Sequence, residues 1–156
     1  MTVQMVVAEA GIGYATFFRH FASIDALLMA VSETMIGEIV ERIGPALASG
    51  DQDALLKAAA TYIAEQRRPI AAILIGGGER TRKAITAQAI ARAEHVPLVL
   101  DPGLPPALAV THLVGSAIDV VAWWVINGDG HDAERLVEML RRLALAPVTA
   151  SEPASR

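Results

Sequence analysis

The sequence contains no cysteine among its 156 residues, few aromatic residues (4%) and no excess of positive charge. The absence of cysteine excludes a disulfide framework, cysteine-based zinc sites and thiol catalysis. The 13 lysines and arginines are outnumbered by 17 aspartates and glutamates, so no overall positive field indicates a nucleic-acid partner. Hydrophobic residues make up 53% of the chain, which excludes disorder for most of its length.

Long apolar runs are also scarce. The one stretch long enough to cross a membrane covers residues 107–126, but it contains Thr111, His112, Ser116 and Asp119. A central aspartate opposes insertion by about 2.5–3.5 kcal/mol, so we expect a helix buried in protein rather than a membrane span. The beginning of the chain lacks the basic residues and the continuous apolar run of a signal peptide. We therefore expect a cytoplasmic protein without a membrane partner.

Hydrophobic residues recur every three or four positions through most of the chain, which predicts helices and no sheet. Gly44-Pro45 is expected to end one long helix, and Asp132 is expected to cap the last helix. The fold class predicted is all-α, with a disordered tail over residues 147–156. The expected helices cover residues 24–43, 53–66, 69–76, 79–94 (exposed and charged), 107–126 and 133–145.

Two short helices joined by a tight turn are expected near the N-terminus. Thr2 can cap the first helix, and Gly11 suits the left-handed position just past its end. In the second helix, a rotation of about 100° per residue puts Phe17 on the inner face, with Ala15 and Arg19 on the opposite one. Arg19 can there donate two hydrogen bonds to a guanine edge in the major groove. This pattern is that of a helix-turn-helix, whose second helix reads DNA bases.

The stretch GIGYATFFRHFASIDALL resembles the signature of the TetR family of helix-turn-helix transcriptional regulators. The resemblance covers residues 2–28 and fixes the spacing of Gly11, Thr16 and Phe21, among others. It implies a set of residues that face DNA, on and just before the second helix. They are Gly13, Tyr14, Ala15, Thr16, Phe18, Arg19 and His20.

The resemblance also implies a domain organisation and a function. A DNA-binding domain with its linking helix is expected over residues 1–44, with the helix-turn-helix over about residues 2–21. A helical effector-binding and dimerisation domain is expected over residues 45–146. The implied protein is a homodimer that binds a palindromic DNA operator, acts as a repressor, and is released or modulated by a small-molecule effector.

The family pattern includes a further helix ahead of Thr2, whereas this sequence starts at Met1. We therefore expect that first helix to be missing and the apolar residues beneath it to be exposed. Two hypotheses stay open: a DNA-binding regulator, and a truncated helical dimer that keeps only ligand binding and dimerisation. The residues expected to lose cover are Val3, Val7, Ile12, Phe17 and Phe21.

The last two expected helices carry apolar stripes. We expect these stripes to pack against the same helices of a second copy, in a four-helix dimer interface. The alternative is burial within a single chain. The residues concerned are Val110, Leu113, Val114, Ala117, Ile118, Val120, Val121, Trp124 and Val125, then Leu136, Leu140 and Leu143.

Polar residues within an apolar helical region need partners, which makes some of them candidates for effector binding. These candidates are Tyr62, His112, Asp119 and Trp123, and a satisfied core or interface pair is the alternative for each. The four histidines lack the spacing of metal ligands, and no catalytic motif occurs. We expect no metal, no cofactor and no enzymatic activity.

Overall fold

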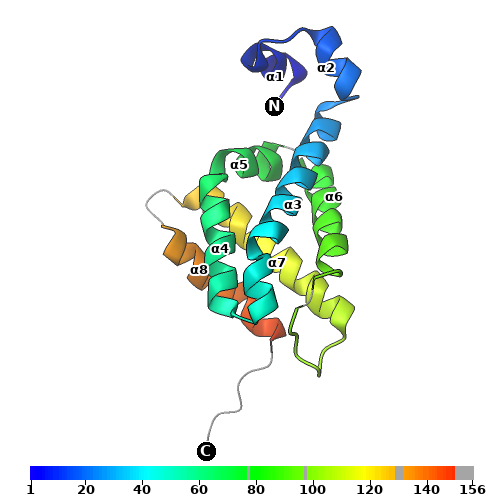
Figure 1. Cartoon of the computed structure of the whole chain (residues 1–156). Coiled ribbons are helices and arrows are strands. Elements are labelled where there is room, and N and C mark those ends of the chain that lie inside the picture. The colour runs from blue at the N-terminus through cyan, green and yellow to red at the C-terminus, as the bar shows by residue number, and fades with distance from the viewer. Residues whose placement is uncertain (77, 97, 129–131, 150–156) are drawn as a thin grey trace, which may run out of the picture.

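Helices account for all the regular structure in the described part of the chain. The computed structural model describes residues 1–76, 78–96, 98–128 and 132–149, and no strand occurs among them. The predicted all-α fold class is therefore confirmed. Helices α1 (Val3–Ala10) and α2 (Tyr14–His20) lie together at one end of the molecule, beyond a body formed by the other helices (Figure 1).

The first two helices form as their flanking residues predict. The Thr2 hydroxyl accepts a hydrogen bond from the Met5 amide at 3.3 Å and so caps α1. Gly11 ends α1 with a φ of 65°, a left-handed conformation in which a Cβ would clash with the backbone. The Ile12 amide then donates to the Val7 carbonyl at 3.0 Å, which closes the turn between the helices.

The apolar faces of α1 and α2 pack chiefly against each other. Val7 and Phe17 are only 6% and 2% exposed, so the expectation that they lack cover is wrong. Each is covered because the turn folds α2 back onto α1. Ile12 is 39% exposed, as expected, and Val3 and Phe21 are half-buried.

Helix α3 (Ile24–Ser49) joins this pair to the body. The Ser23 hydroxyl caps its start by accepting a backbone N–H at 3.1 Å. The expected end at Gly44-Pro45 is wrong, since the helix continues through Pro45 and ends at Gly50, whose φ is 71°. Packing of these last turns on the next helix, with Ala46 buried, outweighs the single backbone hydrogen bond that proline removes. The domain boundary expected between residues 44 and 45 therefore falls inside α3.

Helices α4 (Gln52–Glu65) and α6 (Gly78–Ala93) flank α3 on its two sides, with the short α5 (Arg67–Gly76) between them in sequence (Figure 1). The expectation that α6 is exposed is wrong on one face. Thr81 and Ile85 are buried against α3, where the Thr81 hydroxyl donates to Asp25 at 3.1 Å. Packing on α3 thus gives α6 an inner side that its weak apolar pattern does not indicate.

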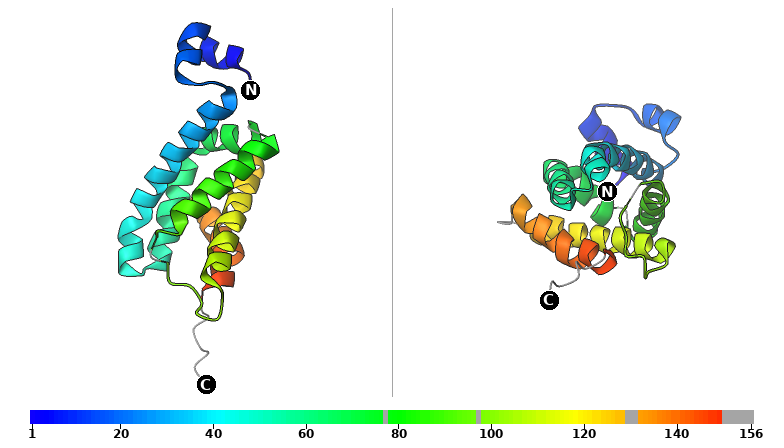
Figure 2. Two further views of the ribbon diagram at one scale, coloured as in Figure 1. Left: turned by 90° about the vertical axis from the view of Figure 1, so that its right-hand side faces the viewer. Right: turned by 60° about the horizontal axis from the view of Figure 1, so that its bottom comes forward.

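Helices α7 (Pro106–Asn127) and α8 (Ala133–Leu140) form the side of the body opposite α3 (Figure 2). The predicted Asp132 cap is confirmed, because its carboxylate accepts the Arg135 amide at 2.9 Å. The chain continues through a π-helical turn, Arg141–Leu145, and a 3₁₀ turn, Ala146–Val148.

The start of the expected disordered tail is wrong. Val148 is 2% exposed, and its carbonyl accepts the Asp101 amide at 2.9 Å. Burial of this side chain and its backbone bond anchor residues 147–149 to the body. The rest of the expected tail, residues 150–156, lies outside the described residues.

Most of the apolar stripes assigned to a dimer interface are instead the core of a single chain. Side chains of α7 and α8 pack there against Leu56 and Ile63 of α4, because α4 and α5 cover that face. Leu143 is the exception, at 55% exposure. The buried members of the stripes are Val110, Val120, Val121, Trp124, Val125, Leu136 and Leu140.

Gly128, which follows α7, is expected to tolerate no side chain. A Cβ at this position would overlap the Trp124 carbonyl oxygen, which is backbone and cannot rotate away. We expect Gly128→Ala to lower the free energy of unfolding by at least about 1–3 kcal/mol, the usual cost of overpacking. Urea unfolding followed by circular dichroism measures the change. The control is Gly37→Ala, whose Cβ would meet only the mobile Arg92 side chain at 3.6 Å, and equal losses in both variants would contradict the prediction.

Candidate nucleic-acid interface and ligand cavity

The residues predicted to face DNA lie on one accessible surface around α2. Tyr14 and Phe18 are about half exposed, at 50% and 53%, and Thr16 is half-buried. Contact between this surface and DNA stays a prediction. The exposed members of the set are Gly13, Tyr14, Ala15, Phe18, Arg19 and His20.

Arg19 is the cation on this surface. Within the described residues it makes no hydrogen bond or ion pair, so its guanidinium is free to meet another molecule. Ala15, one helical turn earlier, is also exposed, and its small side chain projects little from that face of α2. A long arginine beside a small residue has room to reach a base edge when the helix lies in a major groove.

An aromatic cluster holds α2 in place behind this surface. The Phe17 ring packs edge-on against Phe18, with 5.3 Å between centroids, and lies 5.9 Å from the Phe21 ring. Phe17 itself is buried between α1 and α2. Helix α3 follows α2 in the chain and joins this unit to the body.

Of the four candidate effector-binding residues, only Tyr62 faces a cavity. Asp119 and His112 are exposed on the outer side of α7, and Trp123 is 48% exposed there. The assignment of these three to a pocket is wrong, because the inner side of α7 is occupied by its aliphatic residues. The Asp119 carboxylate instead accepts a hydrogen bond from Arg82 of α6 at 2.6 Å.

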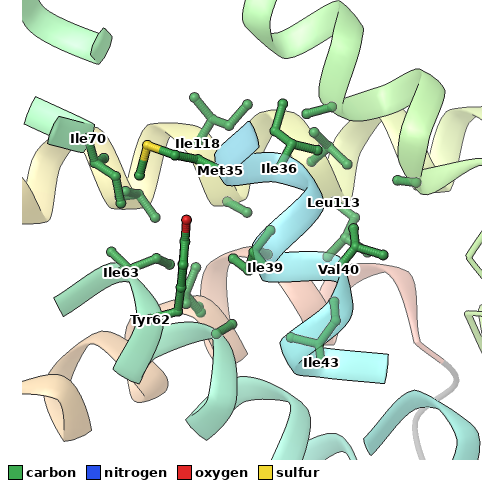
Figure 3. Close-up of a pocket in the computed structure, with 18 of the residues that line it drawn as sticks. Met35, Ile36, Ile39, Val40, Ile43, Tyr62, Ile63, Ile70, Leu113 and Ile118 are labelled. Carbon is green, nitrogen blue, oxygen red and sulfur yellow. The ribbon is translucent and has the colours of Figure 1, made fainter. Parts of the chain in front are cut away.

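A partly open cavity of about 310 Å³ lies in the body, between α3, α4, α5, α6 and α7. Side chains from several of these helices point into it, as Figure 3 shows. Sequence reasoning missed this lining. The available signal was the unusually broad apolar face of α3, which is wider than packing on one neighbour requires. The lining residues from α3 are Ser32, Met35, Ile36, Ile39, Val40 and Ile43.

Tyr62 lines this cavity with a side chain that is held in place and uncharged. Its hydroxyl donates to Glu38 Oε2 at 2.8 Å, and the Arg42 guanidinium lies 5.3 Å from its ring centroid. Burial raises the pKa of Tyr62 above its usual value near 10, and the hydrogen bond to Glu38 and the negative charge of Glu38 raise it further. The hydroxyl is therefore protonated at neutral pH and already engaged.

Among the residues that the structure describes, no group of three or more histidines, aspartates and glutamates is placed to hold a metal ion. His131, one of the four histidines, lies outside the described residues.

Residues 1–31 match the family model described as bacterial regulatory proteins, tetR family. No curated protein and no solved structure matches the chain. The matched segment covers α1, α2 and the first turns of α3. The match supports a helix-turn-helix transcription regulator of the DNA-binding kind. Its first 31 residues belong to the TetR type, which confirms the resemblance found in the sequence.

Helix α7 is long and apolar enough to cross a membrane, by length and composition alone. In the folded chain its inner face packs against α5, α6 and the π-helical turn, and Ala109, Val120 and Trp124 are buried there. The inner apolar face of α7 therefore belongs to the core of the body.

Proposed function

We propose that the protein is a cytoplasmic transcriptional repressor that binds a palindromic operator as a homodimer and is released by a small-molecule effector in the central cavity. The observation that carries the proposal is the match of residues 1–31, together with the accessible, unpaired Arg19 on α2. The cavity supports the effector, because α3 contributes to its wall and also carries the DNA-binding pair.

The outer face of α7 supports the homodimer. A stripe of accessible or half-buried residues recurs there at intervals of three and four, the pattern of a helix that packs along another helix. The apolar members Leu108 and Ile126 are 61% and 58% exposed, although most large apolar residues of the body are buried. The stripe consists of Leu108, His112, Gly115, Asp119, Ala122 and Ile126.

The stripe is complementary to itself. An antiparallel pairing of two α7 helices, centred between Gly115 and Ser116, puts His112 opposite Asp119 of the second copy. The same register puts Leu108 opposite Trp123 of the second copy. Gly115 then lies at the crossing, where the lack of a side chain lets two backbones approach closely. Such a two-fold interface uses the same surface of both copies, as a symmetric dimer requires.

The effector acts through α3 in this proposal. A ligand that fits the cavity better in one position of α3 shifts the population toward that position. Because α1 and α2 follow α3, the spacing of the two reading helices changes, and a palindrome needs them about 34–36 Å apart. The ligand and the operator then reduce each other's affinity by the same factor.

Selection from random double-stranded DNA tests the proposal. A dimeric regulator is expected to enrich a palindrome with half-sites about one helical turn apart, and to lose affinity steeply with salt. Sequencing of the bound pool and fluorescence anisotropy at several salt concentrations provide the readout. Absence of any enriched sequence from a folded, dimeric protein would overturn DNA reading and leave the non-DNA-binding helical dimer as the function.

A further inference from the structure

The wall of the central cavity is almost wholly hydrocarbon. Among the described residues that line it, Ser32 and Tyr62 alone carry a polar side-chain atom, and no lining residue is charged. The rest are isoleucine, leucine, valine, alanine and methionine from helices on every side. Figure 3 shows the Tyr62 oxygen as the one polar atom among the labelled side chains.

Both polar side chains already have partners within the protein. The Tyr62 hydroxyl donates to Glu38 at 2.8 Å, and the Ser32 hydroxyl donates to the Met29 carbonyl at 2.8 Å. Ser32 also lies 3.2 Å from the Gln88 side chain. Both hydroxyl protons are therefore engaged, and a ligand in the cavity finds no free donor. An acceptor such as a carboxylate that is buried against this lining loses its hydrogen bonds to water without replacement, and only the two hydroxyl oxygens remain as acceptors.

The charges nearest to Tyr62 do not face the cavity. Arg42 lies over the Tyr62 ring but is exposed and pairs with Glu65 at 2.8 Å. Glu38 accepts a hydrogen bond from the Tyr62 hydroxyl, but Glu38 is not one of the lining residues. A carboxylate or an amine buried against this lining would thus be an unpaired charge, which is strongly unfavourable.

The size of the cavity limits the ligand further. An apolar cavity of about 150 Å³ accepts benzene, which has six carbon atoms. The volume of about 310 Å³ here is close to twice that, so about ten to twelve carbon atoms fit. Aliphatic walls with one adaptable methionine, Met35, and a single aromatic ring suit an aliphatic ligand better than a stacked planar one.

We propose that the central cavity binds an uncharged aliphatic molecule of about ten to twelve carbon atoms, held by apolar contact. Its role as the effector rests on the function proposed above, whereas its binding does not. The ligand class follows from the lining, the satisfied hydroxyls of Ser32 and Tyr62, and the volume.

The test uses the full chain with ¹³C-labelled isoleucine methyl groups and two probes of equal length, decane and decanoate. Decane, supplied as an overlying phase, is expected to shift the methyl signals of lining residues such as Ile39 and Ile63. The signals of Ile12 and Ile126, which lie outside the lining, should stay in place. Decanoate is expected to bind at least about 100-fold more weakly, because its charge stays unpaired.

A substitution that fills the cavity tests the site, and the same substitution at an exposed position is its matched control. Ala89 and Ala87 lie on the same helix, α6, but Ala89 lines the cavity whereas Ala87 is exposed. Ala89→Phe is expected to abolish the decane shifts, and Ala87→Phe is expected to keep them. The comparison of decane with decanoate on the unchanged chain needs neither variant, so a folding defect in Ala89→Phe leaves the test intact.

The outcomes separate the ligand class from the regulatory role. No shift with decane, or equal affinity for decanoate, would overturn the proposed ligand class. Decane binding with unchanged affinity for the selected operator would support the ligand class and overturn the effector role. Decane binding that also weakens operator binding would support both.

Discussion

Replacing Arg19 by alanine is expected to weaken binding to the selected operator by at least about 30-fold and to remove the preference for guanine in each half-site. A bidentate arginine–guanine contact contributes about 1–3 kcal/mol of discrimination, and a dimer makes it twice. The combined loss is about 2–6 kcal/mol, which is a factor of about 30 to 20,000 in affinity. Fluorescence anisotropy with the operator and with single-base variants measures both effects.

The fold should survive this change. Arg19 is exposed and makes no hydrogen bond or ion pair within the described residues, so its removal leaves no buried group without a partner. Arg92→Ala is the matched control, since it removes the same side chain from an exposed position on α6. That control is expected to keep operator affinity and base preference. A uniform small loss in both variants, with the guanine preference intact, would show that Arg19 does not read bases.

The sequence predicts the N-terminal unit well, because its structure depends on short-range features. The Thr2 cap and the Gly11 turn are properties of neighbouring residues, and the structure has both. The match of residues 1–31 confirms the resemblance on the same segment. The same local reasoning fails at Pro45, where a long-range contact between α3 and α4 decides the outcome.

Sequence periodicity could not show which face of α7 lines the cavity and the core and which face is accessible. An apolar stripe indicates that a helix face is buried, but not whether the partner is the same chain or a second one. The residues of α7 with the strongest stripe, such as Val121 and Trp124, belong to the core cluster that residues of α4 and α8 share within the chain. The weaker stripe through Gly115 is the accessible one. Likewise His112 and Asp119 share a face of α7, but only the three-dimensional packing shows that this face points outward.

Replacing Gly115 by glutamate is expected to weaken the proposed dimer by about 100-fold or more. The antiparallel register puts the two copies of residue 115 next to each other at the crossing of the α7 helices. Two carboxylates would then oppose each other in a desolvated interface, and such like-charge contacts cost several kcal/mol. Sedimentation velocity across a range of protein concentrations measures the change in dimer dissociation constant.

The single chain should accept this substitution, which makes the result specific to the interface. A Cβ at Gly115 meets no atom within 4 Å in the isolated chain, and replacing a glycine inside a helix favours the helix. Gly37→Glu is the matched control on α3, where the nearest atom to a new Cβ is the Arg92 guanidinium at 3.6 Å. This control adds the same charge in a helix and is expected to leave the dimer intact.

Operator binding is expected to respond to Gly115→Glu as well as to Arg19→Ala, but in different ways. A monomer carries one reading helix and contacts one half-site, so Gly115→Glu should also lower operator affinity at protein concentrations where it no longer dimerises. Unlike Arg19→Ala, it should leave the guanine preference within a half-site unchanged, because α2 is untouched. A dimer that resists Gly115→Glu would mean that the two copies meet through another surface, and the exposed stripe of α7 would need a different partner.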